Sequence, residues 1–573
     1  MAGMANADPG DEREGGHESP SPRIRGSQPP PGATRRSRGS TFGRFLQRTP
    51  RDSTRLRGVA GAAGIVAFGF ILSRVLGLAR SVAIADAFGT DPELSAWWVA
   101  FRLPDLVFQV LAGATLSAAF IPVFSRVLLR HGEAEAWRLA SSVLNLVALA
   151  TFVLAAVAFA LAPVLVPWLA PELGVEAGRE DELKGLAVEL TRYMLISPLL
   201  FGISGMITGI LNARQHFIAP ALAPAIYNLA IIGGAVFLAG PFGIHGLVWG
   251  VVLGSLGHLL IQAPALRAVG MRWSPSLDVF STSVHDVLRL MGPRVIGLAS
   301  TQVNLVALVF FASFVSDEAI SAINYAFLMM MLPIGVVGMA IATAAFPTLA
   351  QHAAAGESYQ LRASLTRALR AVLFLALPAS IGLLLLAEPG VRVLLERGAF
   401  DAGSTRLVTQ ALQVFAIGVL AHSGVEILSR GFYALADTRT PVTIAVISMA
   451  LNIALAAVLI GPLELRGLAA ALTIAGIVEF AVLVVLLHRR LGGFEALSLR
   501  RTVWSTIAGS LVLAQAILIA LLLLGRAGVA DDTTAGALLR IVIAGGLGTL
   551  AFVAVTYVIH REDYAVVTAR LRR

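Results

Sequence analysis

The sequence predicts an all-α protein that crosses a membrane about fourteen times, with two six-helix lobes followed by two further helices. Composition, the lengths of the apolar runs and an internal repeat support this prediction. Of the 573 residues, 57% are hydrophobic and 14% are charged, and the mean hydropathy is +0.78. A soluble protein of this size cannot bury that much apolar surface in its core. The chain therefore belongs in a lipid bilayer.

The apolar runs have the length of membrane-spanning helices. Residues 139–169, 442–460 and 504–524 are examples. Each meets or approaches the ~20 residues that a helix needs to cross a hydrocarbon layer ~30 Å thick. Counting such runs along the chain by hydropathy gives about fourteen spans.

The first 57 residues read as a disordered basic tail. They are rich in Pro, Gly, Ser and Arg and have no apolar periodicity. They also lack the short apolar core and the cleavage site of a signal peptide. Basic residues beside a span stay in the cytoplasm, so we expect the amino terminus there. These residues are Arg44, Arg48, Arg51, Arg55 and Arg57.

The charges of the predicted loops alternate in sign along the chain. Alternate loops are basic, with Arg126, Arg130, Arg138, Arg267, Arg272, Arg362, Arg367, Arg370, Arg430, Arg439, His488, Arg489 and Arg490. The loops between them are acidic or mixed, with Asp91, Glu93, residues 172–182, Asp317, Glu318, Asp531 and Asp532. The pattern predicts an even number of spans with both termini in the cytoplasm. Membrane orientation therefore explains the net charge of +9 better than a nucleic-acid partner does.

An internal repeat divides the chain. Residues 88–120 and 314–346 align without a gap at a constant offset of 226 residues, which pairs Phe88 with Phe314 and Ser95 with Ser321. We therefore divide the chain into a tail (1–57), a first lobe with spans one to six (58–270), a second lobe with spans seven to twelve (271–490), and a last part with two spans and a short cytoplasmic tail (491–573). Transporters with parallel repeats bind substrate between their halves and expose it alternately to each side.

Three arginines lie within or near the first two predicted spans. Arg74 and Arg80 are in the first and Arg102 is near the start of the second. An arginine near the bilayer centre costs ~2.5–3.5 kcal/mol, so such residues usually face a wet cavity or an anionic partner. Arg74 and Arg80 are six positions apart, so their side chains project about 120° apart on a helix. Ser73, Gly77 and Arg80 share one face. Snorkelling to the interface remains an alternative for each arginine.

We predict that these arginines form the cationic wall of a central cavity. The repeat position equivalent to Arg102 is Leu328, so the wall is cationic on one side. A guanidinium binds phosphate through two parallel donors and stays charged at any working pH, so two or three would suit a diphosphate. An anionic headgroup that leaves a negative cytoplasm gains ~2.3 kcal/mol per charge per 100 mV.

Several other activities lack their expected signatures. There is no phosphate-binding loop of the kind that hydrolyses ATP, and no Asp-rich pair for metal-assisted phosphate chemistry. The chain has no cysteine, so disulfides and thiolate metal sites are excluded. We expect no cofactor, no metal and no enzymatic activity. Glu426, in an apolar span, could accept a proton or a cation or could bond neighbouring helices. Glu396 and Arg397 are expected to pair with each other.

Eight stretches of the sequence carry motifs of a known family. They are ILSRVLGLARSVAIADAFG, VAFRLPD, LSAAFIPVFSRVL, LNARQHFIAPALAPAIYN, VLRLMGP with TQVN, AIATAAFPTLA, LLERGAF and SRGFYALADTRTP, which cover most of residues 58–490. Together these motifs resemble the MurJ (MviN) family of lipid II flippases in the MOP exporter superfamily. The resemblance implies twelve helices in two lobes, plus two carboxy-terminal helices that frame a groove for the lipid tail. It also implies that Arg74, Arg80 and Arg102 are cavity arginines that bind substrate. Ser81 and Leu328 depart from the family pattern, because many members have Asp and a basic residue there.

The implied function is movement of an undecaprenyl-diphosphate-linked peptidoglycan precursor, lipid II, from the inner to the outer leaflet of the bacterial cytoplasmic membrane. We expect alternating access driven by membrane potential, in a monomer that contacts membrane lipids and no nucleic acid. Two alternatives stay open. The chain could export another lipid-linked oligosaccharide or a drug, or it could be a scaffold of the same fold that does not transport.

Overall fold

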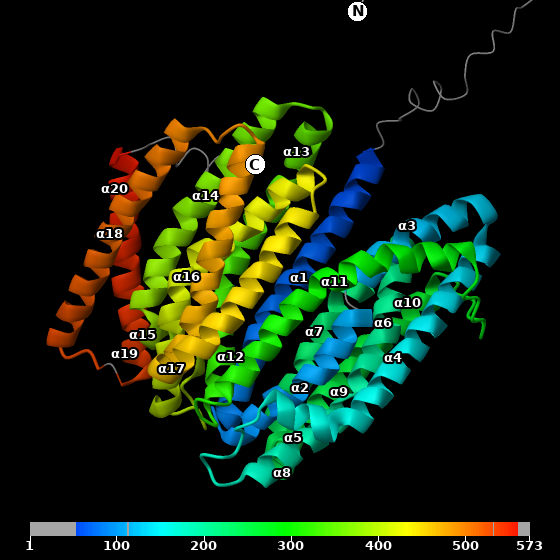
Figure 1. The fold of residues 1–573 in the computed structure, drawn as a ribbon, viewed down its shortest axis with the longest axis horizontal. Coiled ribbons are helices and arrows are strands. Elements are labelled where there is room, and N and C mark those ends of the chain that lie inside the picture. The colour runs from blue at the N-terminus through cyan, green and yellow to red at the C-terminus, as the bar shows by residue number, and fades with distance from the viewer. Residues whose placement is uncertain (1–52, 112–113, 531, 560–573) are drawn as a thin grey trace, which may run out of the picture. The chain divides into compact units, whose positions relative to one another are not determined.

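The computed structural model describes residues 53–111, 114–530 and 532–559 (Figure 1). The described residues contain helices and connecting loops and no strand. The chain divides into two units, residues 1–59 and 60–573. The helices discussed below belong to the second unit, apart from the first residues of α1, 53–59. The two predicted tails, residues 1–57 and the last residues of 491–573, lie mostly outside the described residues.

The first lobe consists of helices that follow one another through short loops. They are α1 (Ser53–Phe88), α2 (Pro92–Leu111), α3 (Ala114–His131), α4 (Glu133–Leu169), α5 (Glu180–Met194), α6 (Ile196–Ala213), α7 (Ile218–Gly233), the π-helix η1 (Gly234–Leu238), α8 (Ala239–Phe242), α9 (His245–Leu260) and α10 (Ala263–Ala268).

The second lobe and the carboxy-terminal helices continue in the same manner. They are α11 (Thr282–Ala312), α12 (Ala319–Pro333), the π-helix η2 (Ile334–Met339), α13 (Ala340–Ala354), α14 (Ser358–Leu385), α15 (Ala387–Leu395), α16 (Ala402–Ala434), α17 (Arg439–Arg490), α18 (Ala496–Arg526), α19 (Thr534–Arg540), the π-helix η3 (Ile541–Gly545) and α20 (Gly546–Ile559).

Eleven helical segments of the described chain are long and apolar enough to cross a membrane. One of them, α17, contains 52 residues and a kink at Glu464, where φ is 50°. At ~1.5 Å per residue it is about 78 Å long, enough for two crossings of a ~30 Å layer. A multi-pass membrane protein is therefore confirmed, and the count of about fourteen spans stays a prediction.

Small residues bring neighbouring helices close together. At the contact of η1 with α9, a Cβ added to Gly234 would lie 2.6 Å from the Gly246 carbonyl oxygen and 3.0 Å from the Gly250 Cα. A larger side chain at Gly234 would therefore force the two helices apart. In lipid such close packing holds helices together, because burial of apolar surface gives little drive between them.

The two copies of the repeat meet in space. Ser95 on α2 and its repeat equivalent Ser321 on α12 lie hydroxyl to hydroxyl at 2.9 Å. Equivalent residues touch each other when they lie near a two-fold axis. The repeat found in the sequence thus places α2 and α12 at the junction of the two halves.

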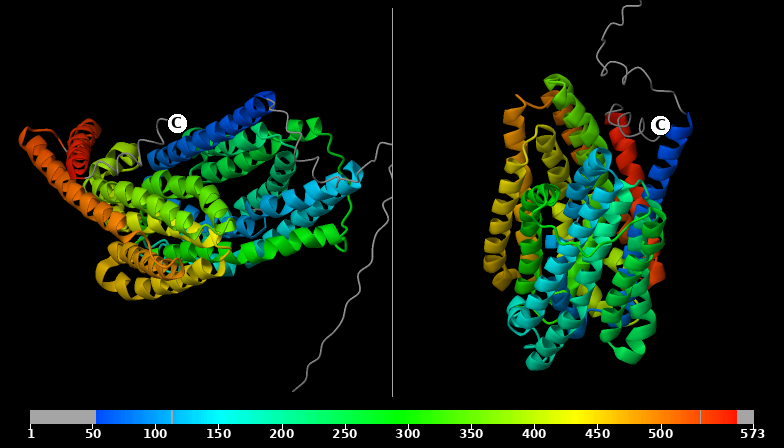
Figure 2. Two further views of the ribbon diagram at one scale, coloured as in Figure 1. Left: turned by 90° about the horizontal axis from the view of Figure 1, so that it is seen from above. Right: turned by 90° about the vertical axis from the view of Figure 1, so that its right-hand side faces the viewer.

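The last two long helices lie at the edge of the second lobe. α18 packs on α14 and on α20, and Figure 1 and the left view of Figure 2 show α18 and α20 at the edge of the bundle. They share a small apolar cluster with α14 that is built around Phe374, Ile517 and Phe552. This agrees with the prediction of two helices added to a twelve-helix core.

Candidate functional site

Arg102 lies at the junction between the two repeats. Its side chain is buried, at 8% exposure, and Nη2 donates to Oδ1 of Asn324 on α12 at 2.7 Å. Asn324 is held in turn, because its Nδ2 donates to the Ile320 carbonyl at 2.6 Å. The Arg102 Nε has no hydrogen-bond partner among the described residues. Snorkelling is therefore wrong for Arg102, which keeps one donor free for a ligand.

An acidic residue one turn further along α2 makes a second link between the lobes. Asp105 Oδ2 accepts from Nε2 of Gln302 on α11 at 2.9 Å. Asp105 is a site residue that was not predicted from the sequence. A carboxylate three residues after an intramembrane arginine, in the motif VAFRLPD, was the signal that could have revealed it.

Arg80 faces the helices of its own lobe. Its guanidinium is close enough to Tyr227 on α7 for the two groups to interact electrostatically. Tyr227 interacts in the same way with Asp105. On the same face, Asn228 Nδ2 donates to the Ser73 carbonyl at 3.3 Å and lies close to Gly77. The predicted common face of Ser73, Gly77 and Arg80 is therefore the face that packs on α7. The neighbouring Ser81 turns back to its own helix, where its hydroxyl donates to the Gly77 carbonyl at 3.2 Å.

Arg74 points toward the second lobe. Its guanidinium carbon lies 5.1 Å from the centroid of the Phe70 ring. A Cβ added to Gly335, in η2, would lie 3.3 Å from Arg74 Nη1. The glycine therefore leaves room for the guanidinium. Arg74 and Arg80 point to different walls, as the spacing of six residues predicts.

The second lobe contains a polar cavity of about 280 Å³ between α11, α12, α16 and α17. Asn452 Nδ2 donates to Asn304 Oδ1 at 3.0 Å, so Asn304 bridges two helices. Asn452 Oδ1 and His422 Nε2, both lining the cavity, have no partner among the described residues. Glu426 bonds to Arg430 on its own helix, at 2.6 Å from Nη1.

A junction of loops joins the two lobes on the side that the predicted topology places outside. It is formed by residues 88–91, between α1 and α2, and residues 397–404, between α15 and α16. The Ala399 N–H donates to the Asp86 carbonyl at 2.8 Å, and the hydroxyls of Thr90 and Ser404 are 2.9 Å apart. Gly89 has φ +54°, and a Cβ there would lie 2.4 Å from the Ala399 carbonyl oxygen. Glycine is needed because both the conformation and the close approach exclude a side chain.

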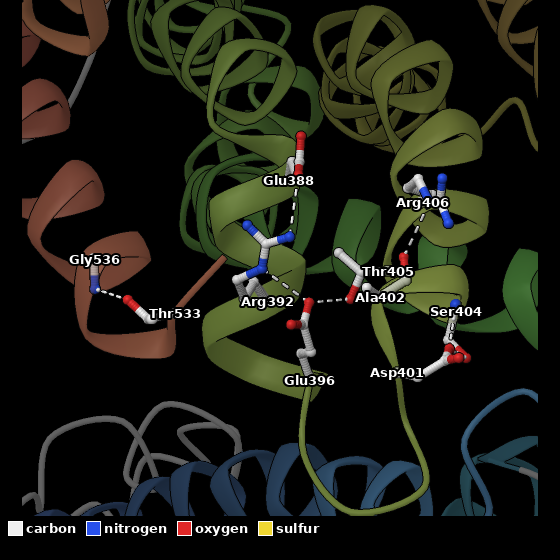
Figure 3. Close-up of polar contacts among 10 residues, drawn as sticks. All are labelled: Glu388, Arg392, Glu396, Asp401, Ala402, Ser404, Thr405, Arg406, Thr533 and Gly536. Atoms are coloured by element: carbon white, nitrogen blue, oxygen red, sulfur yellow. Dashed lines mark hydrogen bonds and ion pairs between the residues drawn. The ribbon is translucent and has the colours of Figure 1, made fainter. Parts of the chain in front are cut away.

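Carboxylates line a cavity of about 430 Å³ at this junction. Burial raises the pKa of Asp91, and the nearby charges of Glu93 and Asp401 add to the effect. Burial also raises the pKa of Glu318. The negative charges of its acidic neighbours raise it further, and Glu176 contributes most among them. Asp401 caps the start of α16 (Figure 3). Its pKa is lowered, chiefly by the hydrogen bond that its carboxylate accepts from the Ser404 backbone N–H.

The short helix α15 is tied to α16 through one arginine and one glutamate (Figure 3). Arg392 bonds to Glu388 at 3.2 Å and to Glu396 at 2.9 Å, and Thr405 donates to Glu396 at 2.6 Å. The expected pair of Glu396 with Arg397 is wrong. Side chains four apart face each other on a helix and adjacent ones do not, and Arg397 instead donates to the carbonyls of Val393 and Leu394.

Comparison with solved structures first defines the class of protein. An inward-facing multidrug resistance MATE family transporter of the MOP superfamily matches with a TM-score of 0.62 and 17% identity, over 73% of this chain and 94% of that one. At this identity the likeness concerns the fold alone. The fold is thus the one on which such membrane transporters are built.

A closer set of relatives then defines the family. The family model described as lipid II flippase MurJ matches residues 84–535, so the chain belongs to the MurJ family. A probable lipid II flippase MurJ from Rhizobium tropici is 32% identical over 73% of this chain and 79% of its own length. The Burkholderia cenocepacia lipid II flippase MurJ is 30% identical over 66% and 73%. A solved structure of lipid II flippase MurJ in an inward closed conformation matches with a TM-score of 0.71 and 25% identity, over 87% of this chain and 99% of that one. The family resemblance read from the motifs is confirmed.

Proposed function

We propose that this chain flips lipid II from the cytoplasmic to the outer leaflet of the bacterial cytoplasmic membrane. The observation that carries the proposal is the family match over residues 84–535, together with curated relatives that are named lipid II flippases. The protein acts as a transporter rather than an enzyme. It works as a monomer with both termini in the cytoplasm, needs no metal or cofactor, and contacts lipid II and membrane lipids but no nucleic acid.

Arg102, Arg80 and Arg74 bind the diphosphate of the substrate in this proposal. Arg102 has one free donor and one bond to a neutral amide. A charge-assisted bond from guanidinium to phosphate is roughly twice as strong as a bond between neutral groups. A diphosphate that enters between the lobes would therefore replace Asn324 as the partner of Arg102. That exchange would loosen the contact between α2 and α12 when cargo is present.

Asp105 has a complementary role in the empty protein. It lies one turn from Arg102 on α2 and bonds to Gln302, so the pair carries no net charge when the substrate is absent. The three arginines and Asp105 together give the empty site a charge of +2, which a diphosphate with two negative charges would neutralise. The membrane potential, negative inside, then favours the inward return of the empty, positive site by ~2.3 kcal/mol per net charge per 100 mV, and it does not oppose outward movement of the loaded, neutral site.

Complementation tests the proposed function. Expression of the chain in a bacterium depleted of its own MurJ should restore growth and cell shape. Failure of complementation, with normal amounts of the protein in the membrane, would contradict the proposal. Binding of a different lipid-linked oligosaccharide or a drug by the purified protein would then identify an exporter of that cargo. Absence of transport of any such substrate would identify a scaffold.

A further inference from the structure

A crevice of about 760 Å³ lies between α4 and α5, away from the arginine site. Its walls are mainly apolar, and three small residues, Ala155, Ala156 and Gly185, form part of the lining. Phe152, Phe159 and Ile196 line it with side chains that are about half exposed. The volume lies within the ~300–1,000 Å³ that is typical of sites for small molecules.

One cation stands at this crevice without a carboxylate partner. The Arg192 guanidinium carbon lies 4.9 Å from the centroid of the Phe159 ring, and Nε donates to the Phe159 carbonyl at 3.4 Å. The described residues give its two Nη groups no hydrogen-bond partner. These groups therefore have donors to offer to a ligand in the crevice.

The nearest carboxylates on α5 make contacts with other residues. Glu189, one turn before Arg192, also lines the crevice and contacts His245 Nε2 at 3.3 Å. Glu180 at the start of α5 holds Lys184 at 2.5 Å. The contacts of Arg192 are thus the face of the Phe159 ring and the Phe159 carbonyl. These neutral groups stabilise its charge less than an anion would.

Arg192 lies beside exposed aromatic residues, at the edge of the hydrocarbon layer. It is twelve residues beyond Glu180, the first residue of α5, which is about 18 Å along the helix axis. Tyr193 and Trp249 beside it are exposed aromatic residues with ring centroids 6.2 Å apart. Such residues concentrate where acyl chains meet headgroups. A cation at this depth is stabilised by an anion that reaches it from the same region of the bilayer.

We propose that this crevice binds a glycerophospholipid of the surrounding membrane. One acyl chain lies along the apolar wall, and the phosphate accepts hydrogen bonds from the Nη groups of Arg192. The apolar walls and the single cation match the two halves of this ligand. The site is separate from the proposed lipid II site, whose arginines are on α1 and α2.

The bound lipid would brace the helix that carries Arg102. Thr191, next to Arg192, donates to the Ala100 carbonyl of α2 at 3.3 Å, and α5 packs along α2. Lipid held against α5 therefore supports the element that positions the cavity arginine.

Native mass spectrometry of the purified full-length chain tests the proposal. Wild-type protein is titrated with phosphatidylglycerol and, separately, with diacylglycerol that has the same acyl chains. We expect the phospholipid to bind about tenfold more tightly, because hydrogen bonds to a charged group contribute ~1.5–3 kcal/mol. Arg192→Gln should abolish this preference. Arg397→Gln, in the loop that follows α15, is the matched control and should keep it.

Gly185→Leu provides a second, independent test. A Cβ at Gly185 meets nothing within 4 Å, so leucine fits there without strain and fills the crevice. It should weaken the binding of both lipids and leave Arg192 in place. Equal binding of the two lipids to wild-type protein would overturn the proposal. Displacement of phosphatidylglycerol by undecaprenyl phosphate at equal concentration would also overturn it, and would make the crevice a substrate site. Because lipid binding is measured on purified protein, the result does not depend on whether the chain transports lipid II.

Discussion

The two copies of the repeat use the same helix for different purposes. In the first copy, α2 carries Arg102 and Asp105. In the second copy, α12 has Leu328 and Met331 at the equivalent positions and contributes the neutral Asn324 as a partner. The two helices nevertheless meet at equivalent positions, since the side chains of Ser95 and Ser321 contact each other. Symmetry of the fold therefore does not extend to the charges.

This difference determines how easily the lobes separate. Both links from α2 join a charged group to a neutral amide, Arg102 to Asn324 and Asp105 to Gln302. Separation of a buried ion pair leaves two uncompensated charges, whereas here each charged residue stays on α2, near the other. The first copy thus keeps the charge that would bind cargo, and the second copy supplies partners that cargo can replace.

Removal of Arg102 should have the largest effect. Arg102→Ala eliminates two or more donors to phosphate, and we expect transport to fall at least about 100-fold, since such bonds contribute ~1.5–3 kcal/mol each. The measurement is complementation of a MurJ-depleted strain, together with flipping of labelled lipid II in vesicles. Asn324→Ala is the control, because it removes the neutral partner and should lower transport only a few-fold. Equal effects of the two substitutions would show that the bond between lobes matters and the charge does not.

Arg80→Ala should reduce transport about tenfold or more, because Arg80 is the other arginine that faces the first-lobe wall. Arg80→Lys keeps the charge but loses the planar pair of donors, so it should retain part of the activity. Flipping in vesicles measures both. Wild-type transport by Arg80→Ala would restrict the cation site to Arg102 and would remove Arg80 from it.

Arg74→Ala should be milder, with a loss of about two- to five-fold, comparable to one exposed charge contact worth under ~1 kcal/mol. Arg74 is exposed and lies against Phe70 and Gly335, so water screens its interaction with a ligand. Gly335→Ala gives a matched test, since the added methyl group would crowd the guanidinium. If Arg74→Ala abolished transport while Arg80→Ala did not, the order of these two residues would be reversed.

Much of the fold could be predicted from the sequence, because the signals are local. Apolar runs of span length predicted the helices, and the repeat aligned Ser95 with Ser321, two residues that the structure places in contact. The different directions of Arg74 and Arg80 followed from helical geometry alone. The motifs also identified the family, which the match over residues 84–535 confirms.

The partners of the site residues could not be predicted, since they depend on contacts between distant segments. Asn324 is 222 residues from Arg102, and Gln302 is 197 residues from Asp105. No local pattern contains such distances. The wrong pairing of Glu396 with Arg397 has a related cause, because neighbours in the sequence were taken for neighbours in space and Arg392 was overlooked.

The junction of loops is the place where pH should act, with the smallest effect. Asp91 in the first lobe and Glu318 in the second have raised pKa values when the junction is closed. A raised carboxylate pKa means that the closed state binds protons more tightly than a state in which the carboxylates are separated and hydrated. Closure is therefore favoured as the pH falls toward the ordinary carboxylate pKa of ~4, and this contribution is lost as the pH rises above the raised values. Asp401 contributes little to this pH dependence, because its pKa is lowered by bonds within its own helix cap, which closure of the junction leaves unchanged.

Cross-linking of cysteines introduced at Thr90 and Ser404, whose hydroxyls are 2.9 Å apart, measures closure of this junction. Activated linkers that react at low pH allow the yield to be followed between about pH 4 and pH 7, the range in which these carboxylates titrate. We expect the yield to rise less than about twofold on acidification, because exposed carboxylates interact weakly. Asp91→Asn should flatten the profile and Asp401→Asn should not. A yield that stayed constant or fell on acidification in the unsubstituted background would show that Asp91 and Glu318 do not control the junction.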